Sequence, residues 1–163
     1  MNIIVSDTTA LINLARGDLL FLLNNLFKTI YVPKAVYEEL IVKDDLVSLR
    51  VNRFKKIEVK EITDINIFEK VKKSKLDLGE SEAITLALEL DLMLIIDERK
   101  GRKVAQSYGL NIVGVLGLIL ENYRQKFITY DDVIYYFEVA QKNGLRLNKE
   151  LKKFFIEKLE QIK

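Results

Sequence analysis

The sequence predicts a three-layer α/β/α fold, in which helices cover both faces of a central, mainly parallel sheet. Short apolar runs of strand length alternate along the chain with segments whose apolar residues recur at helical spacing. Strands that are separated by helices favour parallel pairing, and parallel sheets are buried on both faces. The chain has 163 residues, 49% of them hydrophobic, which is enough for one domain with a substantial core.

The N-terminal elements begin with an apolar strand at residues 2–6 (NIIVS). Residues 9–27 have helical spacing that is interrupted by a Gly-Asp pair, which predicts two helices. β-Branched and aromatic residues predict a strand at 29–32 (TIYV). Pro33 then favours the start of the helix KAVYEELI, because proline suits the first helical position.

The middle of the chain repeats this alternation. Residues 56–62 (KIEVKEI) alternate like a half-exposed strand, and a Lys-rich helix is predicted at about 65–74. A helix at 80–90 (ESEAITLALEL) and a buried strand at 92–96 (LMLII) follow. We therefore expect this part to add two strands and two helices to the sheet and its layers.

The C-terminal part completes the sheet and adds a helical extension. A helix is predicted at 98–109, a short strand at 111–114 and another helix at 116–126. Residues 127–163 are expected to form a helical pair that packs on the preceding domain, 1–126, or on a partner chain. Aromatic residues in this extension are expected in a core or an interface.

Composition excludes several kinds of chemistry. The chain has no cysteine and no histidine, so thiolate nucleophiles, Cys-based zinc sites and imidazole catalysis are absent. Carboxylates are therefore the first candidates for catalytic groups. The net charge of +2 does not by itself identify a nucleic-acid partner. We expect a cytoplasmic protein without a membrane segment, because no apolar run approaches the roughly 20 residues that span a bilayer and no signal core begins the chain.

Two acids follow strands that are expected at the centre of the sheet. Asp7 comes after the first strand, and Asp97 comes directly after LMLII. Sites in open parallel sheets form beyond the carboxyl ends of the strands, so these two side chains are expected to meet. Further acids on neighbouring helices can face the same place: Glu38, Glu39, Glu80 and Glu82.

Each of these acids also fits a structural role. Asp7 and Asp97 suit helix N-caps, and Glu80 and Glu82 suit the first turn of a helix, where the helix dipole favours negative charge. The glutamates at 38 and 39 fit a solvated helix face. A functional site is favoured by the whole set, because clustered carboxylates repel one another unless a hard divalent cation is present.

Five segments, in this order, resemble the PIN-domain superfamily: VSDTTALINLA, YVPKAVYEEL, LGESEAITLALEL, LIIDERKGRKVA and LNIVGVLGLIL. The similarity is strongest to a prokaryotic PIN-like group long catalogued as a domain of unknown function. It covers residues 2 to about 126, and the tail NGLRLNKELKKFF is also similar.

The resemblance implies a set of site residues. The catalytic acids would be Asp7, Glu39, Glu82 and Asp97, and the metal ligands would be these four with Glu80. Thr8 and Thr9 match hydroxyl positions that hold a water. Ala10 replaces a proline that is common in the group, and glutamates at 80 and 82 replace a lone aspartate, which changes the reach of the ligands.

The resemblance also implies an activity and partners. The expected function is Mg²⁺- or Mn²⁺-dependent hydrolysis of phosphodiester bonds in single-stranded RNA. The expected context is the toxin of a toxin–antitoxin pair, with a small antitoxin protein as partner and a homodimer as assembly. Basic residues beside the acids are expected to contact RNA: Arg99, Lys100, Arg102 and Lys103. A second basic cluster comprises Arg50, Arg53, Lys55 and Lys56.

Other functions fit the residues less well or stay open. A haloacid-dehalogenase-type phosphatase needs a second acid where this chain has Thr9, and SDTT offers one acid where a receiver domain needs a pair. No Gly-x-Gly-x-x-Gly motif supports dinucleotide binding. The alternative that stays open is a weak or inactive PIN-like protein that acts as a protein or RNA interaction module.

Overall fold

The computed structural model describes residues 2–42 and 45–162, and it contains a five-stranded sheet in the order β3-β2-β1-β4-β5. All neighbouring strands pair in parallel. The strands are β1 (Ile3–Ser6), β2 (Thr29–Pro33), β3 (Ile57–Lys60), β4 (Leu94–Ile95) and β5 (Ile112–Val113). The predicted α/β class and the parallel sheet are therefore confirmed.

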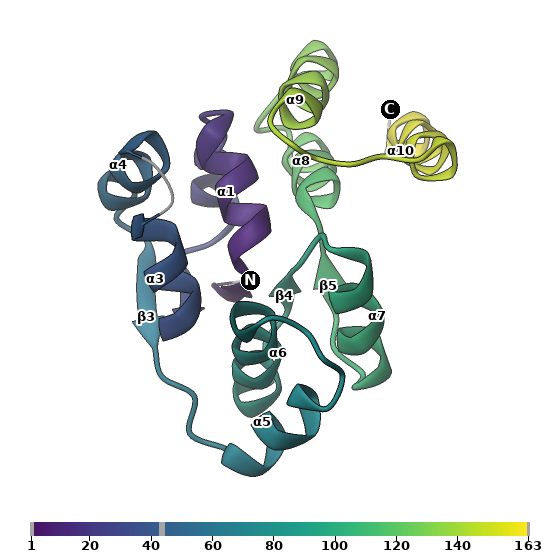
Figure 1. The fold of residues 1–163 in the computed structure, drawn as a ribbon. Helices are drawn as coiled ribbons and strands as arrows, with labels where there is room; N and C mark the ends of the chain where they lie inside the picture. Colours follow the sequence, from purple (N-terminus) through teal and green to yellow (C-terminus); the bar gives the residue numbers. More distant parts are fainter. Residues whose placement is uncertain (1, 43–44, 163) are drawn as a thin grey trace.

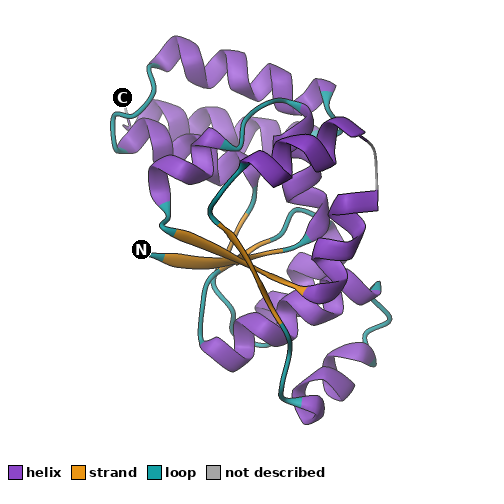
Figure 2. Cartoon of the chain, turned by 90° about the vertical axis from the view of Figure 1, so that its left-hand side faces the viewer, coloured by secondary structure: helices purple, strands orange, loops and turns teal. Residues whose placement is uncertain are grey.

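The helices of the described residues form the two outer layers. They are α1 (Thr8–Arg16), α2 (Phe21–Leu26), α3 (Lys34–Val42), α4 (Asp45–Arg53), α5 (Ile65–Lys72), α6 (Leu78–Leu90), α7 (Arg99–Ser107), α8 (Val115–Arg124), α9 (Tyr130–Lys142) and α10 (Lys149–Ile162). In Figure 1, α5, α6 and α7 lie below the sheet, and α1, α4, α8, α9 and α10 lie above it. Figure 2 shows the twisted sheet between these two layers.

The core follows from the strand pattern. Strand β1 buries Ile4 and Val5 completely, and its neighbour β2 buries Ile30 and Val32. Because Ile4 and Val5 are consecutive and point to opposite faces, β1 is covered on both faces, as expected for a central parallel strand with helices above and below. The edge strand β3 is more exposed, with half-buried residues at its ends and two exposed residues at its middle. Position in the sheet therefore explains why NIIVS is uniformly apolar and KIEVKEI is not.

The C-terminal helices pack on the rest of the chain. Phe137 of α9 stacks on Phe155 of α10 with ring centroids 4.7 Å apart, and both are buried. The buried amide of Asn13 in α1 donates to the backbone oxygens of Ala140 at 2.9 Å and Asn143 at 3.0 Å. These contacts attach the end of α9 to the first helix. The boundary at residue 126 stays a prediction.

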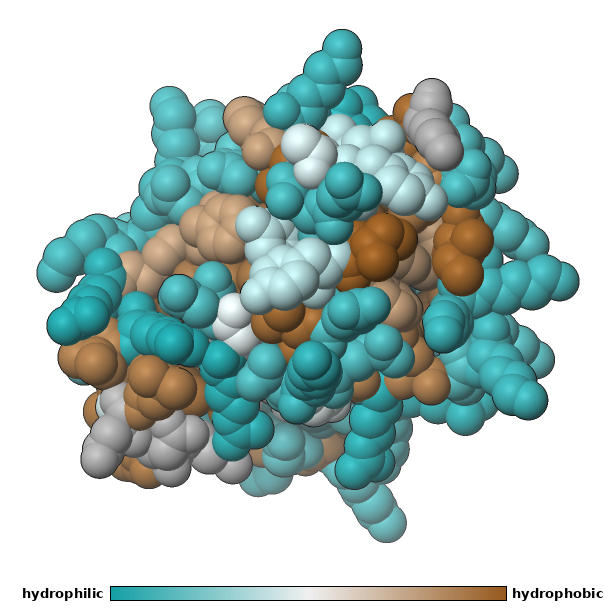
Figure 3. Space-filling view, turned by 90° about the horizontal axis from the view of Figure 1, so that it is seen from above, coloured by the Kyte–Doolittle hydropathy of each residue, from teal (hydrophilic) through white to brown (hydrophobic). Residues whose placement is uncertain are grey.

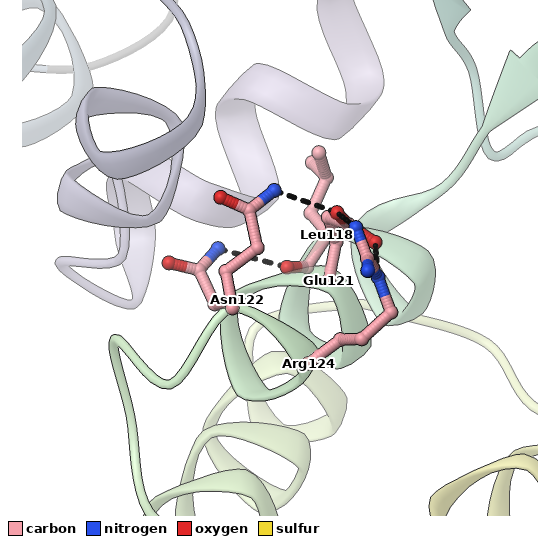
Figure 4. Close-up of polar contacts among 5 residues, drawn as sticks. Leu118, Glu121, Asn122 and Arg124 are labelled. Carbon is pink, nitrogen blue, oxygen red and sulfur yellow. Dashed lines mark hydrogen bonds and ion pairs between the residues drawn. The ribbon is translucent and has the colours of Figure 1, made fainter. Parts of the chain in front are cut away.

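A second buried amide connects α2 and α8. Asn122 donates to the backbone oxygens of Leu22 at 3.0 Å and of Leu118 at 2.8 Å, and it accepts from Asn25 at 2.8 Å. Figure 4 shows its neighbour Arg124 paired with Glu121 on the exposed side of the same helix. Because Asn122 is fully buried, its hydrogen bonds fix how α8 lies on α2.

Three local details differ from the sequence predictions. Helix α4 lies in a stretch for which the sequence predicts no helix or strand. It buries Val47 and Val51, which are one helical turn apart. Pro33 ends β2, and the following helix starts at Lys34. Strands β4 and β5 pair over two residues each, less than their apolar runs suggest. Within the described residues, no helix is long and apolar enough to cross a membrane.

Candidate active site

The candidate site lies where the direction of the strand order reverses. The chain goes from β1 to β2 and β3 on one side, and then returns to place β4 on the other side of β1. Asp7 follows β1 and Asp97 follows β4, and the backbone N–H of Asp7 donates to the oxygen of Ile95 at 3.1 Å. Such reversal points form crevices beyond the strand ends, and both acids lie at the carboxyl ends of neighbouring parallel strands.

Asp7 is a buried carboxylate with one unused oxygen. It is the N-cap of α1, and its Oδ1 accepts from the backbone N–H of Ala10 at 3.2 Å. Its Oδ2 is buried without a hydrogen-bond partner, and the residue is 0% exposed. Burial raises the pKa of Asp7 well above its ordinary value, and the charges of Asp97, Glu80 and Asp77 raise it further. Asp7 therefore caps its helix and also lies in a strongly acidic environment.

Glu80 belongs to the same acidic environment. It lies in the first turn of α6, whose N-cap Asp77 accepts from the backbone N–H of Glu80 at 2.8 Å. Glu80 is 8% exposed. Burial, then the charges of Asp77, Glu98 and Glu39, raise the pKa of its carboxyl from 4.5 to about 7. A positive charge placed here would favour the ionised form of Glu80 as well as that of Asp7.

Thr8 and Glu39 meet at Gly79. A Cβ atom on Gly79 would lie 2.6 Å from Oε1 of Glu39 and 3.0 Å from Oγ1 of Thr8. The absence of a side chain at this position thus leaves room for α1, α3 and α6 to bring these oxygens together. The hydroxyl of Thr8 is buried without a partner, whereas Thr9 is exposed. Of the two predicted water-holding threonines, Thr8 lies in the acidic cluster.

Asp97 has a different environment. Its carboxylate accepts from the backbone N–H of Val115, the first residue of α8, at 3.1 and 3.3 Å. Burial raises the pKa of Asp97, while the hydrogen bond from Val115 and the charge of Arg102 lower it. A helix N-terminus favours negative charge. Asp7 and Glu80 also lie at helix N-termini, so the charge of Arg102 is what distinguishes the surroundings of Asp97 from theirs.

Glu82 points away from this cluster. Its Oε1 accepts from the backbone N–H of Ala35 in α3 at 3.3 Å, and the residue lines an open groove of about 350 Å³ with Lys34, Glu38, Glu61 and Leu78. Successive helical residues are rotated by about 100°, so Glu80 and Glu82 project in nearly opposite directions. The acids whose charges raise the pKa of Asp7 are Asp97, Glu80 and Asp77. The structure thus places Glu80 with Asp7, and Glu82 at the start of α3.

The donor chemistry of the cluster suits a hard divalent cation. All its side-chain donors are oxygens, and two of them, Oδ2 of Asp7 and Oγ1 of Thr8, are buried and without partners. In residues 2–42 and 45–162, no three acidic side chains converge closely enough to form a ready-made ion site. The residue types therefore fit a divalent ion, and the carboxylates would have to draw together around it.

The four basic residues after Asp97 differ in their contacts. Arg102 donates to the backbone oxygen of Ile96 at 2.9 Å, and Lys100 donates to the backbone oxygen of Lys75 at 3.2 Å. Arg99 and Lys103 are exposed on α7. Arg99 and Lys103 thus have the accessibility that RNA contact needs.

The second basic cluster includes residues that cap helices. Arg50 donates to the oxygens of Ala15 at 2.7 Å and Arg16 at 2.9 Å, at the end of α1. Lys56 donates to the oxygens of Asn24 at 2.8 Å and Phe27 at 2.7 Å, at the end of α2. Cations suit helix C-termini. Lys56 also precedes β3, so it lies at the edge of the sheet opposite Asp7.

Sequence reasoning did not single out Asp77, Glu98 or Gly114. Asp77 and Glu98 are the N-caps of α6 and α7, and their charges raise the pKa of Glu80. The spacing Asp77-x-x-Glu80 resembles a capping box, which is a usable signal. Gly114 is adjacent to Asp97, because a Cβ there would lie against Oδ1 of Asp97. No local pattern marks that contact, since it joins two loops.

The sequence matches a PIN domain family over residues 3–161. No curated protein matches it. Among solved structures, the fold is similar to a chain in the crystal structure of VapBC2 from Rickettsia felis bound to a DNA fragment from their promoter. That similarity has a TM-score of 0.53 and 14% identity, and it covers 69% of this chain and 98% of the other. The sequence match shows the family, and the structural match supports the fold.

Proposed function

The chain belongs to the PIN-domain family, and on that premise we propose that it is a metal-dependent endoribonuclease that hydrolyses phosphodiester bonds of single-stranded RNA. PIN domains are generally nucleases that use divalent metal ions. The observation that carries the proposal is the carboxylate of Asp7. It is buried with one oxygen unpartnered, and nearby acids raise its pKa. Such an arrangement is costly unless a cation neutralises it.

We assign the divalent ion, Mg²⁺ or Mn²⁺, to Asp7, Glu80, Glu39 and Asp97. All four were expected from the sequence as metal ligands, together with Glu82, and the rotation of α6 favours Glu80 over Glu82 as the ligand from that helix. A bound divalent ion lowers the pKa of water and neutralises charge on a phosphate. Thr8 offers a buried hydroxyl beside Glu39 that can orient a water, while Glu82 holds the first turn of the helix that carries Glu39.

RNA would approach over the exposed face of α7. Arg99 and Lys103 lie on this helix, which starts just after Asp97. Cations near the acids offset the repulsion between an acidic cluster and a phosphate backbone. Lys100 donates to the backbone oxygen of Lys75 but is exposed, so it would make a weaker contribution to RNA binding.

We further propose that the protein acts in the cytoplasm as the toxin of a toxin–antitoxin pair, with a small antitoxin protein as partner. The similarity of fold to a chain of VapBC2 supports this context. Homodimer formation is also proposed, because α9 and α10 expose apolar residues: Ile134, Tyr135, Leu151 and Phe154. Figure 3 shows apolar side chains between hydrophilic ones on the face to which these helices contribute.

A second candidate function is an interaction module without catalysis. It is favoured by the separation of the carboxylates, since no three of them converge in the described part of the chain. It predicts partner or RNA binding that is insensitive to Asp7. The proposed nuclease instead predicts that the carboxylates close on an ion and that cleavage depends on each of them.

The test compares the wild-type protein with Asp7→Asn and with Asp18→Asn as a matched control. Asp18 is an exposed aspartate with φ of 58°, a conformation that asparagine also adopts. End-labelled single-stranded RNA is incubated with each protein in Mg²⁺, in Mn²⁺ and in chelator. We expect cleavage by wild type and Asp18→Asn with either metal, and none by Asp7→Asn or in chelator. Equal products from wild type and Asp7→Asn, or no cleavage with several RNAs and both metals, would overturn the proposal.

A further inference from the structure

We propose that Arg102 is a positioning residue that fixes the carboxylate of Asp97 between β4 and α8, and that it is not one of the cations that grip RNA. This inference rests on the proposed nuclease function. It separates Arg102 from Arg99 and Lys103, which come from the same basic segment of the sequence.

The guanidinium of Arg102 folds back toward the strand end. Its Nη1 donates to the backbone oxygen of Ile96 at 2.9 Å, and the side chain is half-buried. Ile96 immediately precedes Asp97, so the hydrogen bond from α7 holds the backbone that presents the carboxylate. The stem of Arg102 and its planar donor group are thereby ordered before any ligand arrives.

Gly114 brings the two side chains together. A Cβ atom on Gly114 would lie 3.0 Å from Nη1 of Arg102 and even closer to Oδ1 of Asp97. The guanidinium and the carboxylate therefore lie next to the same glycine, which is the N-cap of α8. Any larger residue would displace one of them.

The other side of the carboxylate is held by α8. Both oxygens of Asp97 accept from the backbone N–H of Val115, at 3.1 and 3.3 Å. The charge of Arg102 lowers the pKa of Asp97. The carboxylate is therefore stabilised from two helices, by Arg102 of α7 and by the N–H of Val115 in α8. Asp7 also accepts from one backbone N–H, but the charges around it are those of acids. Asp97 is thus the acid whose orientation the protein fixes in advance.

Arg102→Gln tests the proposal, with Lys103→Gln as the matched control on the exposed face of α7. Cleavage kinetics are measured with Mg²⁺ on one single-stranded RNA. We expect Arg102→Gln to lower kcat by about tenfold or more and to leave KM within about twofold, as losses of supporting contacts in metal sites commonly do. Lys103→Gln is expected to raise KM and leave kcat unchanged, because it removes a backbone phosphate contact.

A second measurement is independent of cleavage. In the metal-free protein, the amide resonance of Val115 reports its hydrogen bond to Asp97, and we expect it to move in Arg102→Gln and not in Lys103→Gln. Arg102→Lys keeps the charge and loses the planar fork, so it should show a smaller fall in kcat and a smaller shift. If Arg102→Gln does not fold, Arg102→Lys is compared with the wild type and with Lys103→Gln instead.

The opposite result would overturn the assignment. An Arg102 variant that raises KM as Lys103→Gln does, with the Val115 resonance unmoved, would make Arg102 an RNA-contacting residue. If wild-type protein does not cleave RNA, the nuclease proposal fails, while the Val115 resonance still decides whether Arg102 holds Asp97.

Discussion

Gly79 leaves the space that the carboxylate of Glu39 occupies: a Cβ atom on Gly79 would lie 2.6 Å from Oε1 of Glu39. The glycine lies in the first turn of α6, and the glutamate lies on α3. Their approach determines how closely α6 and α3 pack beside the buried hydroxyl of Thr8. It also makes the site sensitive to one methyl group.

Gly79→Ala is expected to reduce cleavage strongly while the protein stays folded. The methyl group would push Glu39 and Thr8 apart, yet alanine favours a helix over glycine by up to about 1 kcal/mol. Activity and thermal unfolding should be measured together. Gly17→Ala is the control, because its Cβ would lie 2.8 Å from Val139, an apolar neighbour. A fully active Gly79→Ala protein would show that Glu39 is not used.

Glu80→Gln and Glu82→Gln should separate the two glutamates of α6. We expect Glu80→Gln to abolish both cleavage and stabilisation by Mg²⁺, because Glu80 lies in the acidic cluster. Glu82→Gln should keep stabilisation by Mg²⁺ and lose only part of the activity, since its amide oxygen can still accept from Ala35. The unfolding temperature of each variant, measured with and without Mg²⁺, shows which glutamate is needed for stabilisation by the ion. The reverse pattern would restore Glu82 as the ligand.

The metal-free protein is expected to lose stability as the pH rises from about 4.5 to about 7. In this range folded Glu80, with its pKa raised to about 7, retains a proton that the unfolded chain has released. Its stabilising contribution is therefore complete below its unfolded pKa of 4.5 and lost above about pH 7. The raised pKa of Asp7 acts with the same sign.

Urea unfolding in chelator across this pH range measures the effect. Glu80 should account for at most about 3 kcal/mol of the change, and Glu80→Gln should flatten the profile accordingly. Added Mg²⁺ should restore stability above pH 7, where the ion no longer competes with protons. A wild-type profile that matches that of Glu80→Gln would contradict the raised pKa.

Asn122→Ala is expected to destabilise the fold without a direct effect on the site. It removes two hydrogen bonds between α8 and α2 and one within α8, and these losses together cost about 3 kcal/mol. Arg124→Gln is the control from the same helix, and we expect little change because its ion pair with Glu121 is exposed (Figure 4). Urea unfolding distinguishes the two. Equal stability of both variants would refute the role of Asn122.

The sequence predicted the placement of Asp7 and Asp97 because both acids end apolar strands. Strand ends are visible in a sequence, and the rule that parallel strands share a carboxyl edge needs no further information. Glu80 and Glu82 were not distinguished in the same way. Both open one helix, and which of them faces the sheet depends on how α6 is rotated about its axis, which is set by packing of residues such as Ile84 and Ala87.

The basic residues show the same limit. Arg99, Lys100, Arg102 and Lys103 form one run in the sequence, but Arg102 turns toward Ile96 while Arg99 and Lys103 stay exposed. Arg50 and Lys56 also resemble RNA-contacting cations until the ends of α1 and α2 are seen beside them. Charge runs predict basic character, and only tertiary structure shows which cations are already engaged by backbone oxygens.

The strand order β3-β2-β1-β4-β5 also has a consequence for protein synthesis. Asp7 precedes β4 in the chain, but β4 joins β1 only after Ile95 has been translated, and Asp97 gains the hydrogen bond from Val115 later still. Chains emerge from the ribosome with the N-terminus first, so the acids of a nascent chain stay apart until β4 has been translated. The last-arriving part of the sheet therefore times the appearance of the complete site, which cannot exist before β4 and the start of α8 have been made.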